Sequence, residues 1–197
     1  MSPVRTKVRD RQRKKDKNKN KTNVLVAKSL LKKKIKTFYD DALSTVCNDV
    51  LLEENVDDSI LELKKVFNAV TGGVGLSASQ IGIFKKIILV SDSKKTKIDI
   101  MINPEIIAHS AKRVSDSEGC LSYPGFYYYI NRWDEVTVKY LDVNKEEKTK
   151  DFKGFSARII QHEIDHTIGQ CKVGDLWRQQ IEVEKEKLIK ARKRKKV

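Results

Sequence analysis

Apolar side chains recur with a helical period in three parts of the chain, and each part predicts a helix. In residues 57–70 the period ends at Thr71-Gly72-Gly73, and Asp57 and Asp58 are N-cap candidates. Residues 155–169 show the same period, with Gly169 as a stop signal. Residues 176–195 predict a second long helix, which is very polar after Ile181 and depends mainly on Glu–Lys pairs.

Strand patterns occupy the stretch between the first two helices. Residues 85–92 and 98–107 are mainly apolar and predict two strands, with Pro104 at an edge or a bulge. Residues 134–143 alternate between apolar and polar side chains, and Asn144-Lys145 can turn the chain back on itself, so we expect a hairpin. Before the first helix, residues 24–36 predict a short helix or strand.

The charge of the chain is concentrated at its two ends. The 197 residues hold 41 Lys and Arg against 27 Asp and Glu, a net +14, which at first favours a nucleic-acid partner. Residues 1–36 carry +13 and residues 182–197 carry +5, which leaves −4 on the part between them. We therefore predict a basic tail over 1–36, disordered over residues 1–23, a folded domain over 37–180, and a basic helix or tail over 181–197.

Composition also excludes several classes of protein. No apolar run approaches the roughly 18 residues of a membrane span, and no apolar signal-peptide core follows the start. Three cysteines are too few for a disulfide framework and suit a reducing compartment. We expect a cytoplasmic protein with no membrane partner. An organelle is the alternative if the basic N-terminus is a transit peptide.

The strongest chemical signal is His162-Glu163-Ile164-Asp165-His166. On a helix, positions i and i+4 share a face, so the two histidines can bind one metal ion, and Glu163 can handle a proton on a bound water. The alternative is a pair of solvent-exposed histidines that bind no metal. Only three histidines occur in the chain and two of them lie in this pattern, which favours the metal site.

A third ligand is needed, because catalytic zinc-like centres usually have three protein ligands and one open position. Downstream, Cys171 and Asp175 are the options, and neither has a peptidase spacing. Upstream, Cys120 lies beside Gly119 and offers a thiolate, although a lone cysteine is more often a small buried apolar residue.

A Gly-rich segment, GVGLSASQ over residues 73–80, is the third feature of interest. It lacks the Lys-Ser/Thr of a Walker loop and precedes a strand, so it is at most a weak phosphate loop. Its small residues suit a backbone that approaches a ligand, and Gln80 offers an amide donor.

Together, GVGLSASQ, EGCLS and QHEIDH resemble the three motifs of peptide deformylases, in the family's order. The resemblance covers about residues 37–180. It implies an α+β fold with antiparallel sheets packed around the helix that carries HExxH, followed by a C-terminal helix.

The resemblance also implies a role for each matching residue. Cys120, His162 and His166 would be the metal ligands, with water in the fourth position. Glu163 would be the general base and then the acid, and Gln80 and the backbone N–H of Leu121 would stabilise the oxyanion. The residues that we expect to contact the substrate are Gly75, Gly119, Phe155 and Ile159. Glu118 and Arg132 would pair and support the cysteine loop; a solvated pair of little energetic value is the alternative.

The implied activity is removal of the N-formyl group from formyl-methionyl nascent peptides by a metal-dependent hydrolase. Ferrous iron is the favoured metal, with zinc, nickel or cobalt as alternatives. We expect a monomer whose basic tails contact the ribosome, target an organelle or only keep the protein soluble. The alternative function is a ribosome- or nucleic-acid-binding protein on a degenerate deformylase scaffold, and an HExxH peptidase is disfavoured because it lacks the downstream ligand.

Two features leave their roles open at this stage. The aromatic segment 125–132 is either a strand that packs its rings on a sheet, which we favour, or an altered rim of the substrate cleft. Arg158 lies one turn before His162 and faces either the methionine pocket or solvent.

Overall fold

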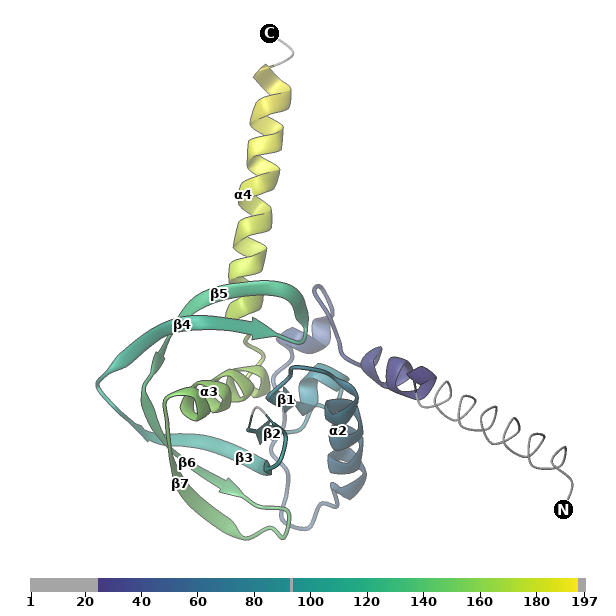
Figure 1. The fold of residues 1–197 in the computed structure, drawn as a ribbon, viewed down its shortest axis with the longest axis vertical. Coiled ribbons are helices and arrows are strands. Elements are labelled where there is room, and N and C mark those ends of the chain that lie inside the picture. The colour runs from purple at the N-terminus through teal and green to yellow at the C-terminus, as the bar shows by residue number, and fades with distance from the viewer. Residues whose placement is uncertain (1–24, 93, 195–197) are drawn as a thin grey trace, which may run out of the picture.

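The structure is a computed structural model that describes residues 25–92 and 94–194 (Figure 1). The predicted disorder of residues 1–23 lies outside the described residues. Residues 25–32 are helical and lead into a turn, so the helical alternative for this segment is correct. Its Leu31 and, just beyond it, Ile35 pack against the core.

Within the described residues, seven strands form two antiparallel sheets. The larger sheet has the order β1-β2-β3-β6-β7, and the smaller one pairs β4 with β5. The strands are β1 (Gly75–Ser77), β2 (Ile87–Ser91), β3 (Ile98–His109), β4 (Arg113–Cys120), β5 (Tyr123–Trp133), β6 (Glu135–Leu141) and β7 (Glu147–Lys153). The predicted hairpin is β6–β7, and Pro104 lies at a register shift of β3, as expected for a bulge.

The helical elements fill the spaces around the sheets. They are the 3₁₀ turns η1 (Asp41–Ser44) and η2 (Ala78–Ile81) and the helices α2 (Asp57–Ala69), α3 (Phe155–Thr167) and α4 (Lys172–Arg194). Figure 1 shows α3 between the β4–β5 ribbon and the larger sheet, and α3 contacts strands of both sheets. The predicted α+β class is confirmed.

Three apolar clusters hold these elements together. One packs α2 against β1, β2 and β3 around Leu63 and Phe67. The second lies between α3 and the larger sheet around Ile160 and Val138. The third joins the start of α4 to β5 around Tyr123. Because α3 is held from two sides, its polar face has a fixed position beneath the end of β4.

Two local predictions need correction. The N-cap of α2 is Val56 without a side-chain cap, so Asp57 and Asp58 lie in the first helical turn, where their charge favours the helix dipole. Helix α4 begins at Lys172, four residues before the predicted start, because Val173 and Trp177 are buried and extend its apolar face. The division into 1–36, 37–180 and 181–197 stays a prediction, and α4 runs across residue 181 without a break.

Candidate metal centre

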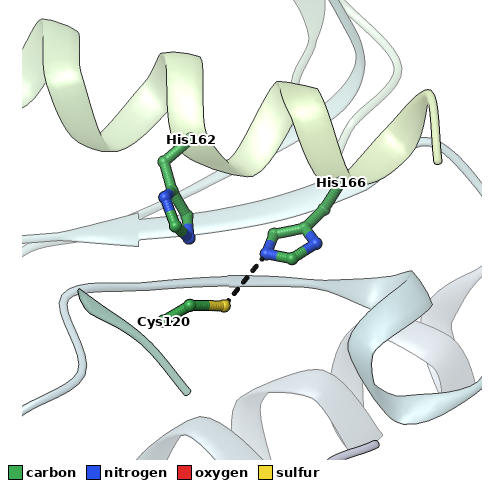
Figure 2. Close-up of side chains that lie close together, drawn as sticks. All are labelled: Cys120, His162 and His166. Atoms are coloured by element: carbon green, nitrogen blue, oxygen red, sulfur yellow. Dashed lines mark hydrogen bonds between the residues drawn. The ribbon is translucent and has the colours of Figure 1, made fainter. Parts of the chain in front are cut away.

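Three side chains with metal-binding atoms converge between α3 and the end of β4. His162 and His166 project from one face of α3 toward Cys120 (Figure 2), and one ligand atom from each residue lies within 4.8 Å of the others. The Cys120 Sγ and His166 Nε2 are 3.3 Å apart. Of the two downstream options, Cys171 is buried near Cys120 as a free thiol, and neither it nor Asp175 belongs to this group.

The residues present fit a divalent metal ion. A thiolate with two imidazoles is a donor set that suits zinc and other borderline-soft ions. Glu163 is the next residue after His162, and its Oε2 is buried with no hydrogen-bond partner among the described residues. A buried carboxylate oxygen without a donor needs an unseen partner, and a water at a metal ion would supply one.

A carboxylate behind His162 selects which ring nitrogen faces the site. The Nδ1 of His162 lies 3.0 Å from Glu118 Oε2, so it donates its proton there and leaves Nε2 free for a metal. Burial alone would raise the pKa of Glu118, but hydrogen bonds from His162 and Arg132 and the nearby positive charge lower it to about 2. Glu118 is therefore ionised at neutral pH and acts as a fixed acceptor.

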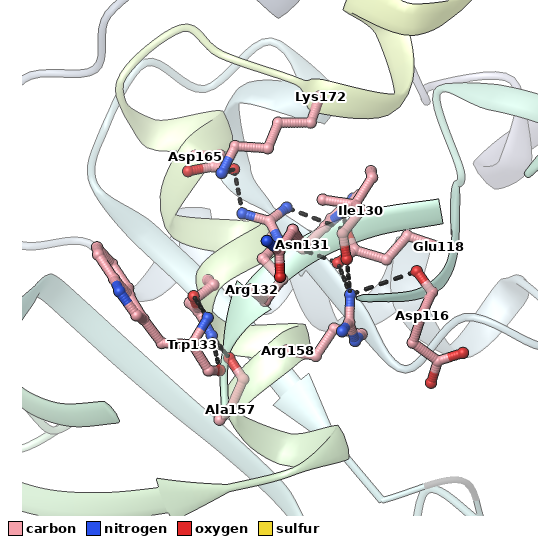
Figure 3. A network of polar contacts seen from close by, with 12 residues as sticks. Asp116, Glu118, Ile130, Asn131, Arg132, Trp133, Ala157, Arg158, Asp165 and Lys172 are labelled. Atoms are coloured by element: carbon pink, nitrogen blue, oxygen red, sulfur yellow. Dashed lines mark hydrogen bonds and ion pairs between the residues drawn. The ribbon is translucent and has the colours of Figure 1, made fainter. Parts of the chain in front are cut away.

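Two buried guanidinium groups hold this carboxylate (Figure 3). Arg132 donates to Glu118 at 2.9 and 3.0 Å and to Asp165 at 2.5 Å. Arg158 donates to Glu118 at 2.7 Å and to the carbonyl oxygens of Ile130 and Val114 at 2.7 and 2.6 Å. The network therefore ties β4, β5 and α3 together. Its two buried guanidinium groups are balanced by Glu118 and Asp165, and the partly exposed Lys172 also pairs with Asp165 at 3.7 Å.

The predicted ion pair of Glu118 and Arg132 is thus present, and it is buried instead of solvated, with side chains 5% and 2% exposed. Arg158 faces neither solvent nor empty space. It lines the cleft while its donors are used by Glu118 and the β4–β5 backbone. In the sequence, the only sign of a role for Arg158 is that it lies one helical turn before His162. This spacing does not reveal its hydrogen-bond partners on β4 and β5.

Two glycines near the candidate metal centre have other side chains so close to them that a side chain of their own would not fit. A Cβ on Gly75 would lie 2.8 Å from both Cγ and Cδ of Glu163, and a Cβ on Gly119 would lie 2.6 Å from the Tyr127 ring. Glu163 is 4% exposed, and this burial raises its pKa to about 8 although His166 favours the ionised form. Such a carboxyl group can both accept and return a proton near neutral pH.

Gln80 lies in η2, and both ends of its side-chain amide are held by hydrogen bonds. Its Oε1 accepts from the Ser77 N–H at 2.9 Å, and its Nε2 donates to Ser122 Oγ at 3.0 Å and lies 3.5 Å from the Cys120 Sγ. Leu121 follows directly in the turn between β4 and β5. Both residues line the same cleft as the metal-binding group.

The cleft has a volume of about 430 Å³ and contains every predicted site residue except His166 and Arg132. His166 does not line the cleft but contacts Cys120, which does. In the same way, Arg132 contacts the cleft residue Glu118. Ile159 is 8% exposed and lies in the wall, whereas Phe155 is 60% exposed at the rim. Within the aromatic segment, Phe126 and Tyr128 pack against the third cluster, and Phe126 and Tyr127 line the cleft, with Tyr127 71% exposed. The two alternatives for this segment therefore each hold for different residues.

A thiol, two imidazoles and an adjacent carboxyl group at the inner end of a cleft define the class of metal-dependent hydrolases with an HExxH helix. The described residues contain no helix that is both long and apolar enough to span a membrane.

Comparison with known proteins identifies the family within that class. The family model for polypeptide deformylase matches residues 32–180, so the chain belongs to the polypeptide deformylase family. A peptide deformylase of Pseudothermotoga lettingae is 39% identical over 140 residues, which cover 70% of this chain and 78% of that protein. One of Natranaerobius thermophilus is 40% identical over 142 residues, with 70% and 87% covered.

Solved structures agree with this assignment. The deformylase of the Vibrio parahaemolyticus bacteriophage VP16T, in complex with actinonin, has a TM-score of 0.65 and 34% identity, with 70% of this chain and 98% of that chain covered. A Met-Ala-Ser-bound class I type b peptide deformylase from Acinetobacter baumannii has a TM-score of 0.64 and 31% identity, with 71% and 94% covered. The chain is thus a peptide deformylase enzyme, and no comparison supports the nucleic-acid-binding alternative.

Proposed function

We propose that this enzyme removes the formyl group from the N-terminal formyl-methionine of newly made polypeptides, with one divalent metal ion held by Cys120, His162 and His166. One observation carries the proposal. The three ligand atoms lie within 4.8 Å of one another at the inner end of a cleft, where Glu163 presents a carboxyl oxygen that has no hydrogen-bond partner in the part of the chain that the structure describes. Ferrous iron is the metal we favour, with zinc, nickel and cobalt as alternatives.

When bound, the ion would supply a Lewis acid that lowers the pKa of a water ligand and polarises the formyl carbonyl. The chain supplies the proton transfers. Glu163 takes the proton from the attacking water and passes it to the leaving amine nitrogen, and its burial, which raises its pKa, favours holding the proton between these two steps. Glu118 keeps the tautomer of His162 in which Nε2 is the ligand atom.

The oxyanion that forms on the formyl oxygen needs donors that are already in place. We assign this role to the Gln80 amide and the backbone N–H of Leu121. Gln80 suits it because its carbonyl end is fixed by Ser77, so the amide cannot turn away. Loss of one such donor typically costs about 2.7–4 kcal/mol of transition-state stabilisation.

The substrate backbone would lie along Gly75 and Gly119 in an extended, strand-like way. The methionine side chain would enter the wall formed by Ile159, with Phe155 at the rim. The buried position of Ile159 and the exposed position of Phe155 support a pocket that is closed at its base and open at its mouth.

The test is formate release from formyl-Met-Ala-Ser by protein purified anaerobically with ferrous iron, compared with zinc, nickel and cobalt forms. We expect release by the wild type and a fall of about 10²–10⁴-fold in kcat for Glu163→Gln, which keeps the shape of the side chain but removes the base. Absence of release by the wild type, or unchanged release by Glu163→Ala, would refute the proposal.

The finer predictions on partners and location are kept with this proposal. We expect a monomer in the cytoplasm whose basic tails raise its concentration at the ribosome through phosphate contacts. Deletion of residues 1–24, which keeps the helix 25–32 and the core contacts of Leu31 and Ile35, should then weaken co-sedimentation with ribosomes at low salt. Unchanged co-sedimentation would remove this role from the N-terminal tail.

A further inference from the structure

A second hollow, of about 620 Å³, lies beside the substrate cleft and is rich in lysine. One wall is a single face of the helix 25–32, where Lys28 and Lys32 are one turn apart. Another is the loop after β2, which contributes Lys94 and Lys95. None of the residues that line the hollow is acidic. The hollow therefore concentrates positive charge at one place on a surface that the substrate cleft also reaches.

Three of the four lysines are available to a ligand. Lys95 is not, because its Nζ donates at 2.8 Å to the carbonyl oxygens of both Phe67 and Val70 and lies over the Phe67 ring. Lys28, Lys32 and Lys94 are exposed, and within residues 25–92 and 94–194 no carboxylate pairs with them. The acidic residue nearest in sequence to Lys94 is Asp92, whose carboxylate accepts from the Thr96 and Lys97 N–H groups.

The cleft and the hollow share Thr71 and Gly72. Gly75 marks the reacting end of the cleft, because it contacts Glu163. Thr71 is four residues away along the chain, and four extended residues span at most about 13–14 Å. The segment bends at Thr71 and Gly72, so this distance is an upper limit. A peptide that runs along the segment with its formyl group beside Glu163 therefore reaches the hollow by its fifth or sixth residue.

We propose that the hollow binds acidic side chains of the substrate, about five or six residues from its formyl end, through Lys28, Lys32 and Lys94. This inference rests on the proposed deformylase function and adds a preference for acidic sequences. Most of the helix 25–32 precedes the matched family segment, which starts at residue 32, so the helical wall of the hollow is largely an addition to the family's domain.

The test compares two peptides of equal shape, formyl-Met-Ala-Ser-Ala-Asp-Glu amide and formyl-Met-Ala-Ser-Ala-Asn-Gln amide. Exposed ion pairs are individually weak, so two of them predict a preference in kcat/KM of about three- to ten-fold for the acidic peptide. The preference should appear in KM and disappear between about 0.02 M and about 0.5 M salt. The variant Lys28→Gln/Lys32→Gln should treat both peptides alike.

The matched control is Lys33→Gln/Lys187→Gln, which removes the same charge from two exposed positions outside the hollow and should keep the preference. Equal kcat/KM for both peptides in the wild type would overturn the inference alone, since formate release from the neutral peptide still reports the deformylase function. No release from either peptide would refute that function. If Lys28→Gln/Lys32→Gln keeps the peptide preference but loses ribosome binding, the hollow is an RNA contact and the inference is wrong.

Discussion

Substitution of Gly75 by alanine should perturb the proposed reaction centre at one point, the side chain of Glu163. Gly75 begins β1, and its backbone is not in the left-handed region, so alanine can adopt the same conformation. The added Cβ would lie 2.8 Å from Cγ and from Cδ of Glu163. Carbon atoms in contact are about 3.5–4.0 Å apart, so the carboxylate must retreat by about 1 Å.

Glu163 has little space for such a movement, because its side chain is 4% exposed and its helix is packed on two sides. A displacement of about 1 Å from the productive geometry can cost about 10²-fold in rate. We therefore expect kcat/KM of Gly75→Ala to fall by about 10²-fold, equivalent to about 2.7 kcal/mol of transition-state stabilisation. Overpacking should also cost about 1–3 kcal/mol of unfolding free energy.

Formate release and thermal unfolding, measured on the same preparations, separate these two effects. The matched control is Gly174→Ala on α4, where a Cβ would lie 2.5 Å from the Tyr123 hydroxyl oxygen and would not touch Glu163. It should lower Tm as Gly75→Ala does and leave most of the activity of the folded protein. If Gly75→Ala keeps kcat/KM within about threefold of the wild type, the position of the carboxylate is not critical and the reasoning fails.

Three further predictions concern the network and the metal. Glu118→Gln removes the negative charge between two buried guanidinium groups and one of its two acceptor oxygens. It should cost about 3–5 kcal/mol of unfolding free energy and weaken metal binding by about 10–100-fold, measured by chelator competition. Because the pKa of Glu118 is lowered from 4.5 to about 2, its contribution to stability is complete above pH 4.5 and is lost as the pH falls toward 2; acid unfolding of Glu118→Gln should lack this part of the pH dependence. A chelator should lower Tm, and the added metal should restore it, because only the folded chain brings Cys120 and the two histidines together. An unchanged Tm after verified metal removal would contradict this last prediction.

Helices and strands whose apolar side chains recur with a clear period could be predicted from the sequence, and the other elements could not. The helices α2 and α3 and the hairpin β6–β7 follow patterns that a few residues establish locally. The sequence does not predict strand β4, because it is mainly polar and neither face of the strand carries a row of apolar side chains. Its conformation depends on pairing with β5, with a register shift between Gly119 and Cys120 that brings the thiol toward α3.

The residues of the candidate site also divide into those that could be placed from the sequence and those that could not. The two histidines share a helix face by spacing alone, so their proximity could be predicted from the sequence. The third ligand and Gln80 needed the family resemblance, since a position 40 or more residues away has no local signal. Arg158 could not be placed by either route. Its position depends on carbonyl oxygens of Val114 and Ile130, which only the folded sheet brings together.

The distribution of charge then has a physical explanation in three parts. Around the metal centre, Arg132 and Arg158 are balanced by Glu118 and Asp165, so a buried network can exist without a net charge that burial would penalise. Residues 37–181 carry a net charge of −4, so the folded part is not the source of the chain's net charge of +14. The excess lies near the two ends, and the helix 25–32 brings part of the N-terminal excess to the hollow beside the cleft. Charge at that position acts on what the substrate carries beyond its methionine, which is why the peptide pair tests it and formyl-Met-Ala-Ser alone does not.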